Sequence, residues 1–253
     1  DILQKEEVKE IQIREFDFEK ENDFDKYEKQ FNWKYNNEIA TQIPIKSTVS
    51  KIKEMQKEGI DFELLNSKEI GIANITPNFM EKEEVVTASK KGTIMHLFLQ
   101  KINFKEDYSV EILENLKEKL VYQKIISEEE AKFINISKIE KFLKSKIAQE
   151  IKQCDKIEKE KAFCTKIKAK EIFEEAEEEE ILVQGIIDLY AIDKKDNIIL
   201  VDYKTDFVEN EQDLMIKYKN QLRIYKKALE NALDLKVTKT CIYSLYLNKE
   251  IYI

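Results

Sequence analysis

The segments Gln184–Tyr190 (QGIIDLY) and Ile198–Asp206 (IILVDYKTD) decide the fold of this 253-residue chain. Each reads as an apolar strand, rich in β-branched residues, that leads into an aspartate. The short charged turn between them predicts a hairpin, which brings Asp188 beside Asp202. Residues i and i+2 of a strand share a face, so Lys204 projects together with Asp202. Two carboxylates and one ammonium group on adjacent strands can hold a divalent cation and position a water molecule.

The flanking residues favour a functional interpretation of these charges. A lone aspartate at a strand end usually forms a turn, and an Asp-x-Lys pair is usually a surface ion pair of little energetic value. Residues 198–201, however, are a continuous apolar run, typical of a strand that is buried on both faces. A charged pair at the end of such a strand costs desolvation energy unless a metal or a substrate compensates for it.

Five motifs, in order, resemble those of the RecB-like branch of the PD-(D/E)xK nuclease superfamily. They are a glycine-led histidine motif, a Glu-x-Pro-Phe segment with alanine in place of proline, Gly-x-x-Asp, Asp-Tyr-Lys-Thr and a Tyr-x-x-Gln-x-x-x-Tyr helix. In this chain they occupy Gly92–Gln100, Lys159–Phe163, Gly185–Asp188, Asp202–Thr205 and Tyr218–Tyr225. An ordered set of five motifs is far more specific than Asp-x-Lys alone.

Within that branch, the chain is similar to the C-terminal nuclease domains of AddA-type subunits of AddAB helicase-nucleases. Ile43–Ser50 (IPIKSTVS) resembles the Pro-x-Lys-x-Ser-Val-Ser segment upstream of their histidine motif. The chain departs from the family pattern at Ala162 and in the acidic insert Glu174–Glu180. A start at Asp1 without a methionine indicates a fragment, with a helicase domain upstream in the same polypeptide.

The resemblance implies an α/β fold with a restriction-endonuclease-like core, in which helices flank a small mixed sheet, plus N-terminal helical decoration. Residues 1–88 are expected to form a helical arm and linker that packs on the core or on a missing motor domain. Residues 89–253 are expected to form the nuclease core. Capping residues predict one helix from Ser47 or Thr48 to about residue 56 and another that begins at Ser89. Further helices are predicted over 109–122, over 127–153 with a break near 135–137, and over 213–233. Further strands are predicted over 160–172 and 239–247.

The resemblance also implies a metal site. The expected ligands of Mg²⁺ or Mn²⁺ are His96, Asp188, Asp202 and the main-chain carbonyl of Tyr203. His96 is the only histidine, and without the motifs a histidine on an apolar helix face would be interpreted as a core residue. Lys204 is expected beside the attacking water and the scissile phosphate, where it lowers the pKa of the water or neutralises developing charge.

Supporting roles are implied for three further residues. Glu160 orients the water or bridges to Lys204, the alternative being a plain surface glutamate. Gln221 and Tyr225, four apart on one helical face, brace the sheet or contact the DNA backbone or the lysine. Asp206 is interpreted as a cap or turn residue.

Composition limits the cofactors and partners. Three scattered cysteines without Cys-x-x-Cys spacing predict reduced thiols and no iron–sulfur cluster. No apolar run is long enough to span a bilayer and no signal peptide is visible, which favours the cytoplasm. A net charge of −8 is unusual for a DNA-binding protein, so we expect a motor domain to deliver the strand.

Three functions follow as hypotheses. The first is a metal-dependent exonuclease domain that trims single-stranded DNA from an attached helicase, with an AddB-like partner subunit, in recombinational repair of double-strand breaks. The second is a free-standing RecB-like exonuclease. The third is a catalytically silent DNA clamp, which an intact His, Asp and Asp-x-Lys set argues against.

Overall fold

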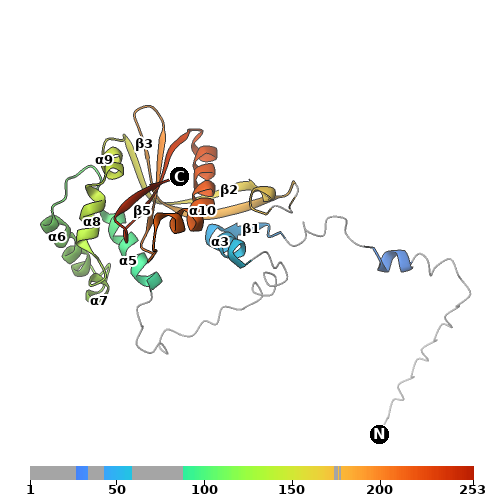
Figure 1. The fold of residues 1–253 in the computed structure, drawn as a ribbon, viewed down its shortest axis with the longest axis horizontal. Coiled ribbons are helices and arrows are strands. Elements are labelled where there is room, and N and C mark those ends of the chain that lie inside the picture. The colour runs from blue at the N-terminus through green and yellow to red at the C-terminus, as the bar shows by residue number, and fades with distance from the viewer. Residues whose placement is uncertain (1–26, 34–42, 59–87, 174–175, 177) are drawn as a thin grey trace, which may run out of the picture.

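The computed structural model describes residues 27–33, 43–58, 88–173, 176 and 178–253 (Figure 1). Its centre is a six-stranded mixed sheet in the order β1-β3-β4-β5-β6, with β2 paired to β3 as well. Because β2 runs antiparallel along the whole of β3, β1 and β4 share the other edge of β3. The strands are β1 (Lys46–Thr48), β2 (Lys156–Lys168), β3 (Glu180–Ile192), β4 (Ile198–Lys204), β5 (Val237–Ser244) and β6 (Lys249–Tyr252).

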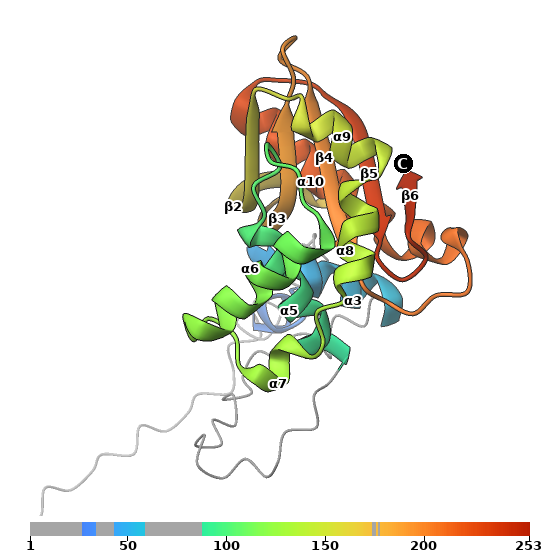
Figure 2. The ribbon, with the colours of Figure 1, turned by 90° about the vertical axis from the view of Figure 1, so that its left-hand side faces the viewer.

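Helices cover both faces of the sheet, as Figures 1 and 2 show. Helices α3 and α10 pack on one face, and the bundle α5–α9 packs on the other. We call these the α10 layer and the α5–α9 layer. The helices are α3 (Val49–Glu58), α5 (Ala88–Lys101), α6 (Val110–Tyr122), α7 (Glu128–Ala131), α8 (Ile136–Leu143), α9 (Lys146–Lys152) and α10 (Glu211–Leu233). The predicted α/β class, a mixed sheet flanked by helices, is confirmed.

Strand β4 explains why its sequence is a continuous apolar run. Ile198 and Leu200 project into the α10 layer, whereas Ile199 and Val201 project into the α5–α9 layer. Both faces are therefore withdrawn from water, and no polar alternation is possible until Asp202. The predicted hairpin to β3 is present, with Leu189 opposite Val201.

The helical bundle differs from the prediction of one broken helix over 127–153, which becomes three helices. Asn135 caps α8 by accepting a hydrogen bond from the Lys138 N–H, at the predicted break. A second break was missed at Ser145, whose hydroxyl accepts from the Ala148 N–H and begins α9. Short polar side chains that satisfy the first N–H groups favour the start of a new helix.

Other boundaries also differ from the prediction. Strands β1 and β6 were not predicted, and β2 covers 156–168 rather than 160–172. The Thr48 hydroxyl accepts from the Lys51 N–H at the start of α3, as expected. Ser89 is not a cap, because α5 already includes Ala88.

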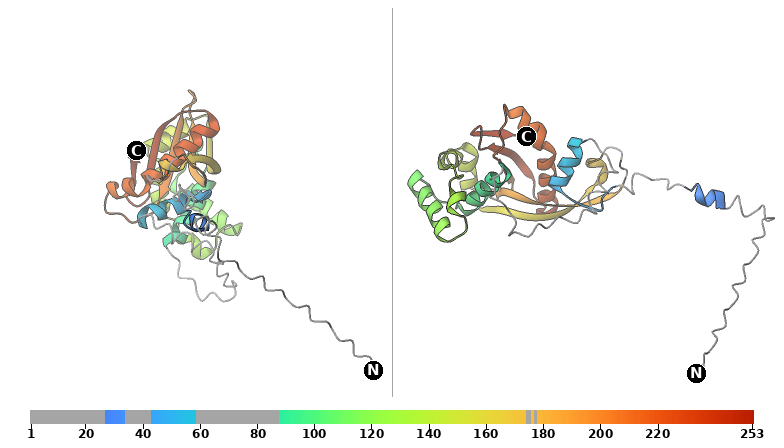
Figure 3. Two further views of the ribbon diagram at one scale, coloured as in Figure 1. Left: turned by 90° about the vertical axis from the view of Figure 1, so that its right-hand side faces the viewer. Right: turned by 90° about the horizontal axis from the view of Figure 1, so that it is seen from below.

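Part of the predicted arm belongs to the core. β1 pairs in parallel with β3, and Val49 and Ile52 of α3 are buried in the α10 layer. The boundary at 88/89 stays a prediction, and residues 1–26, 34–42 and 59–87 lie outside the described part. Tyr27, Phe31 and Trp33 are exposed. Figure 3 shows residues 27–33 away from the sheet. Among the described helices, none is long and apolar enough to cross a membrane.

Candidate active site

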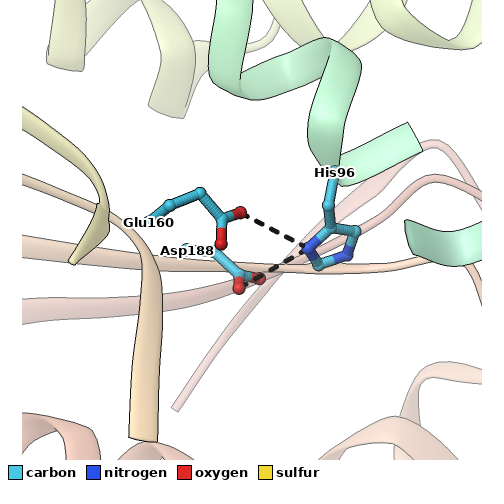
Figure 4. A group of neighbouring side chains, drawn as sticks. All are labelled: His96, Glu160 and Asp188. Carbon is cyan, nitrogen blue, oxygen red and sulfur yellow. Dashed lines mark ion pairs between the residues drawn. The ribbon is translucent and has the colours of Figure 1, made fainter. Parts of the chain in front are cut away.

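Three side chains from distant parts of the chain converge at one point. His96 comes from α5, Glu160 from β2 and Asp188 from β3 (Figure 4). The Nδ1 atom of His96 lies 3.5 Å from Oδ1 of Asp188 and 3.9 Å from Oε1 of Glu160. One possible ligand atom from each residue lies within 4.8 Å of the others. We call these three residues the His96 cluster.

The strand backbone is unusual at this cluster. Residues 159 and 161 pair with 189 and 187, which places Glu160 directly opposite Asp188. Glu160 has a φ of 49°, in the left-handed region that few residues other than glycine adopt. The odd-numbered residues of β2 point to different faces of the sheet before and after Glu160. Ile157 packs in the α5–α9 layer, whereas Phe163 packs in the α10 layer. A left-handed residue interrupts the alternation of a strand, and such strained residues cluster at functional sites.

Asp202 and Lys204 form a second group beside the cluster, on the face that packs on α10. Lys204 Nζ lies 2.7 Å from Oδ2 of Asp202, which is fully buried. The Gln221 side-chain amide donates to Oδ1 of Asp202 at 3.0 Å and to the Tyr225 hydroxyl at 3.0 Å. Gln221 thus contacts the acid, and Tyr225 supports Gln221.

The backbone of Tyr203 joins the two groups. Its N–H donates to Oδ2 of Asp188 at 2.9 Å, which fixes the Asp188 carboxylate against the end of β4. Its ring lies edge-on to His96, with centroids 5.7 Å apart. One backbone position therefore sets the relative positions of an acid and the imidazole.

Burial and neighbouring charges shift the pKa of each group. Complete burial raises the pKa of Asp202 to about 6, against the opposing charge of Lys204. Burial and the charge of Asp188 raise the pKa of Glu160. For His96, burial alone lowers the pKa, but the hydrogen bond and charge of Asp188 outweigh it and raise the pKa. For Asp188, burial alone raises the pKa, but its interactions with His96 outweigh that effect and lower the pKa.

Lys204 contacts Tyr218, which is hydrogen-bonded to Asp206. The sequence had not predicted a role for this pair. The Nζ atom of Lys204 lies 4.3 Å from the centroid of the Tyr218 ring. The Tyr218 hydroxyl donates to Asp206, and Lys217 Nζ donates to the same carboxylate at 2.8 Å. Of the two roles expected for Asp206, it is not the cap of α10, because Asn210 is; it lies in the loop that follows β4. The sequence signal that could have predicted this contact was Tyr218 itself, the first residue of the Tyr-x-x-Gln motif.

Gly92 explains why the histidine motif begins with glycine. A Cβ atom at this position would lie 2.9 Å from the Thr205 hydroxyl oxygen. Helix α5 therefore passes the end of the Asp-Tyr-Lys-Thr segment too closely for any side chain. This close approach lets His96, one turn further along α5, reach Asp188.

The donor chemistry fits a divalent cation. Carboxylate oxygens are the ligands that Mg²⁺ and Mn²⁺ prefer, and a neutral imidazole is a competent ligand for Mn²⁺. The His96 cluster provides both kinds of donor, in a partly buried position. Asp202 is not part of the His96 cluster, because its carboxylate contacts Lys204 and Gln221. The next residue, Tyr203, connects it to the cluster by donating its N–H to Asp188.

Comparisons with known proteins show the family to which the chain is related. The sequence model of the PD-(D/E)XK nuclease superfamily matches residues 65–250. The A subunit of an ATP-dependent helicase/nuclease from Thermoanaerobacter sp. (strain X514) is 35% identical over 226 residues, which are 87% of this chain and 18% of the relative. The corresponding proteins from Clostridium novyi (strain NT) and Alkaliphilus oremlandii (strain OhILAs) are 31% and 34% identical, over 98% and 85% of this chain. The chain spans about one fifth of the length of these relatives.

Proposed function

Because this chain belongs to the PD-(D/E)XK nuclease superfamily and is a nuclease domain related to AddA-type subunits, we propose that it is a metal-dependent deoxyribonuclease acting on single-stranded DNA. The observation that carries the proposal is the His96 cluster placed directly beside Asp202 and Lys204. Such a site unites cation ligands with a buried ammonium group, which a DNA clamp does not need.

We assign the cation to His96, Asp188, Asp202 and the main-chain carbonyl of Tyr203, with Glu160 as a further donor or as the group that orients the attacking water. A bound Mg²⁺ or Mn²⁺ supplies Lewis acidity toward the phosphoryl oxygen and favours ionisation of water. Lys204 neutralises charge that develops on the scissile phosphate.

The neighbouring residues keep this arrangement rigid. Gln221 fixes the Asp202 carboxylate, and Tyr225 accepts the second hydrogen bond of the same amide. The Tyr218 ring and Asp202 hold Lys204 Nζ between them. Preorganised charges of this kind are worth more in a site that excludes water.

The setting of the enzyme is also a proposal. The relatives are about five times longer than this chain, so we place a helicase elsewhere in the same polypeptide, which feeds the strand into the site together with an AddB-like subunit. The net charge of −8 favours such delivery, because an acidic surface does not attract DNA. The work of the enzyme would be exonucleolytic trimming in the cytoplasm during repair of double-strand breaks.

The test is cleavage of end-labelled single-stranded DNA with Mn²⁺ or Mg²⁺, with a chelator control. Asp188→Asn and Lys204→Ala are each expected to lower kcat by roughly 100-fold or more, the range for loss of a group acting in the transition state. Lys195→Ala, an exposed lysine in the β3–β4 turn, is the matched control and keeps full activity. Labels at either end distinguish exonuclease from endonuclease products.

Calorimetry with Mn²⁺ distinguishes the proposed role of Asp188 in cation binding from that of Lys204 in cleavage. Asp188→Asn is expected to lose cation binding, whereas Lys204→Ala retains it. Full cleavage by Asp188→Asn would overturn the site. Cation binding without any cleavage by the wild-type chain would overturn the proposal that this chain is active by itself.

A further inference from the structure

Strand β3 has a break in its pairing next to the His96 cluster. Along one edge, β1 pairs with β3 up to Gln184, and β4 pairs with it from Leu189 onward. Within the described ranges, no strand pairs with residues 185–188 on this edge. This edge of β3 is therefore unpaired from residue 185 to Asp188, and we call this gap in the sheet the notch.

A cavity of about 540 Å³ lies at this notch. Its walls are the junction of β1 and α3 (Thr48–Ser50), adjacent residues of β2 and β3, and Tyr225 of α10. Ligand pockets in proteins span roughly 300–1,000 Å³, so this cavity has the size for one nucleotide. A base pair within an intact duplex would have to be opened before its base entered.

The walls combine apolar surface with polar side chains. Ile186 lies mid-strand, separated from Asp188 by one residue, yet 52% of it is exposed. Phe163 of β2 is half-buried and pairs with Gly185, and Phe163, Thr48 and Ser50 line the same space. An apolar surface that accepts the face of any base, without a fixed set of donors, binds single strands with little sequence preference.

Gly185 lets the walls of the cavity approach one another closely. A Cβ atom there would lie 2.8 Å from the Phe163 ring and 3.0 Å from the Val49 side chain, so no side chain fits between these walls. The close approach also keeps the Phe163 ring against Tyr225, with centroids 5.5 Å apart.

Hydrogen bonds link one wall of the cavity to the catalytic residues. Tyr225 lines the cavity, and the Tyr225 hydroxyl accepts from Gln221, which also holds Asp202. A nucleotide seated here would therefore contact Tyr225, which is joined to Asp202 through Gln221. It would also contact Ile186, two positions before Asp188. Exposed Lys46 of β1 pairs with Leu182 and lies two residues before Thr48, where it suits a strand phosphate.

We propose that this cavity is a subsite for the nucleotide adjoining the scissile phosphate, with Ile186 and Phe163 contacting its base. The subsite gives the enzyme its preference for single strands over duplex. This inference rests on the proposed function, because it names the part of the same site that receives the substrate.

The experiment compares two substrates in the 253-residue chain. One is a short oligothymidylate, and the other is bis(p-nitrophenyl) phosphate, a phosphodiester without sugar or base. Ile186→Trp fills the cavity and is expected to raise KM for the oligothymidylate at least tenfold, with kcat within threefold and hydrolysis of the small diester unchanged. Ile186→Ala is expected to raise KM less. Ile112→Trp, at a 46% exposed isoleucine on α6, is the matched control.

Each other outcome is decisive. An unchanged KM for Ile186→Trp, or an equal rise for Ile112→Trp, overturns the subsite. An equal loss on both substrates also overturns it, because the substitution then acts on the chemistry. If the wild-type chain hydrolyses neither substrate, the proposal that this chain is active by itself fails. The subsite is then judged by anisotropy of a labelled oligothymidylate, which must bind at least tenfold more weakly to Ile186→Trp than to Ile112→Trp.

Discussion

At the scale of single residues, the site concentrates groups whose protons compete with a cation. Burial raises the pKa of Asp202 to about 6 and, together with Asp188, raises that of Glu160. At His96, the hydrogen bond that the imidazole donates to Asp188 and the charge of that carboxylate outweigh burial and raise the pKa. All three groups must release their protons to bind a metal ion.

Metal affinity should therefore depend steeply on pH. A group with a raised pKa keeps its proton to a higher pH, so a cation must displace protons at pH 6 that are already absent at pH 8. We expect the dissociation constant for Mn²⁺ to be roughly tenfold or more higher at pH 6 than at pH 8. Calorimetry in two buffers of different ionisation enthalpy counts the released protons. His96→Gln should flatten the dependence, and equal affinity at both pH values would contradict the assignment.

At the scale of elements, the closeness of α5 to the end of β4 is the feature most open to test. Gly92→Ala should stabilise an exposed helix by about 1 kcal/mol, because alanine is the better helix former. Here the added methyl group meets the Thr205 hydroxyl at 2.9 Å, so either α5 or the segment that carries Thr205 must shift. We expect kcat to fall roughly tenfold or more while the melting temperature does not fall, since misplacement by about 1 Å has this effect on catalysis.

The second variant that checks this explanation is Gly92→Ala combined with Thr205→Ala. Removing the hydroxyl and methyl of Thr205 opens the space that the new methyl group needs, and kcat should recover. Thr205→Ala alone is the control for the hydroxyl. If the double variant stays as slow as Gly92→Ala, the contact with Thr205 does not explain the glycine.

Elements with their own periodicity or with local signals were predictable. The apolar run of β4, its hairpin to β3 and the long helix α10 all appear near the predicted positions. Strand β1 was missed because it has three residues, Lys46–Thr48, and pairs with β3 more than 130 positions away. Ser145 was missed as a cap because α8 and α9 are too short to show a change of period.

The site was predictable in its residues more than in its contacts. The motifs pointed to His96, Asp188, Asp202 and Lys204; His96 lies beside Asp188, Lys204 lies beside Asp202, and the Tyr203 N–H joins the two pairs. Motif order does not show which side chains touch. The left-handed Glu160 opposite Asp188 depends on strand register, which the sequence of β2 does not reveal because its charged residues alternate weakly.

At the scale of the whole molecule, the two layers share their central strands. Leu200 is fully buried in the α10 layer, while Val201 beside it is fully buried in the α5–α9 layer. A loss of packing on one face of β4 is therefore transmitted to the other, and the layers should unfold together.

Leu200→Ala tests this coupling. It should lower the free energy of unfolding by about 2–5 kcal/mol, the usual cost of a cavity at a buried leucine. Urea unfolding measures the loss, and amide hydrogen exchange should show reduced protection in α5–α9 as well as in α10. Ile112→Ala, on an exposed face of α6, should change stability by less than about 0.5 kcal/mol. Protection lost only in α10 would mean that the layers open separately.

The wide spacing of the site residues along the chain has a consequence for biosynthesis. The ribosome makes His96 first, but Gln221 and the β5 partner of β4 follow more than 120 positions later. A nascent chain, or a product of premature termination before α10, would hold the acids without the elements that fix them. The proposed nuclease site would thus be completed only after α10 and β5 have been made, and shorter, unfinished fragments would be inactive.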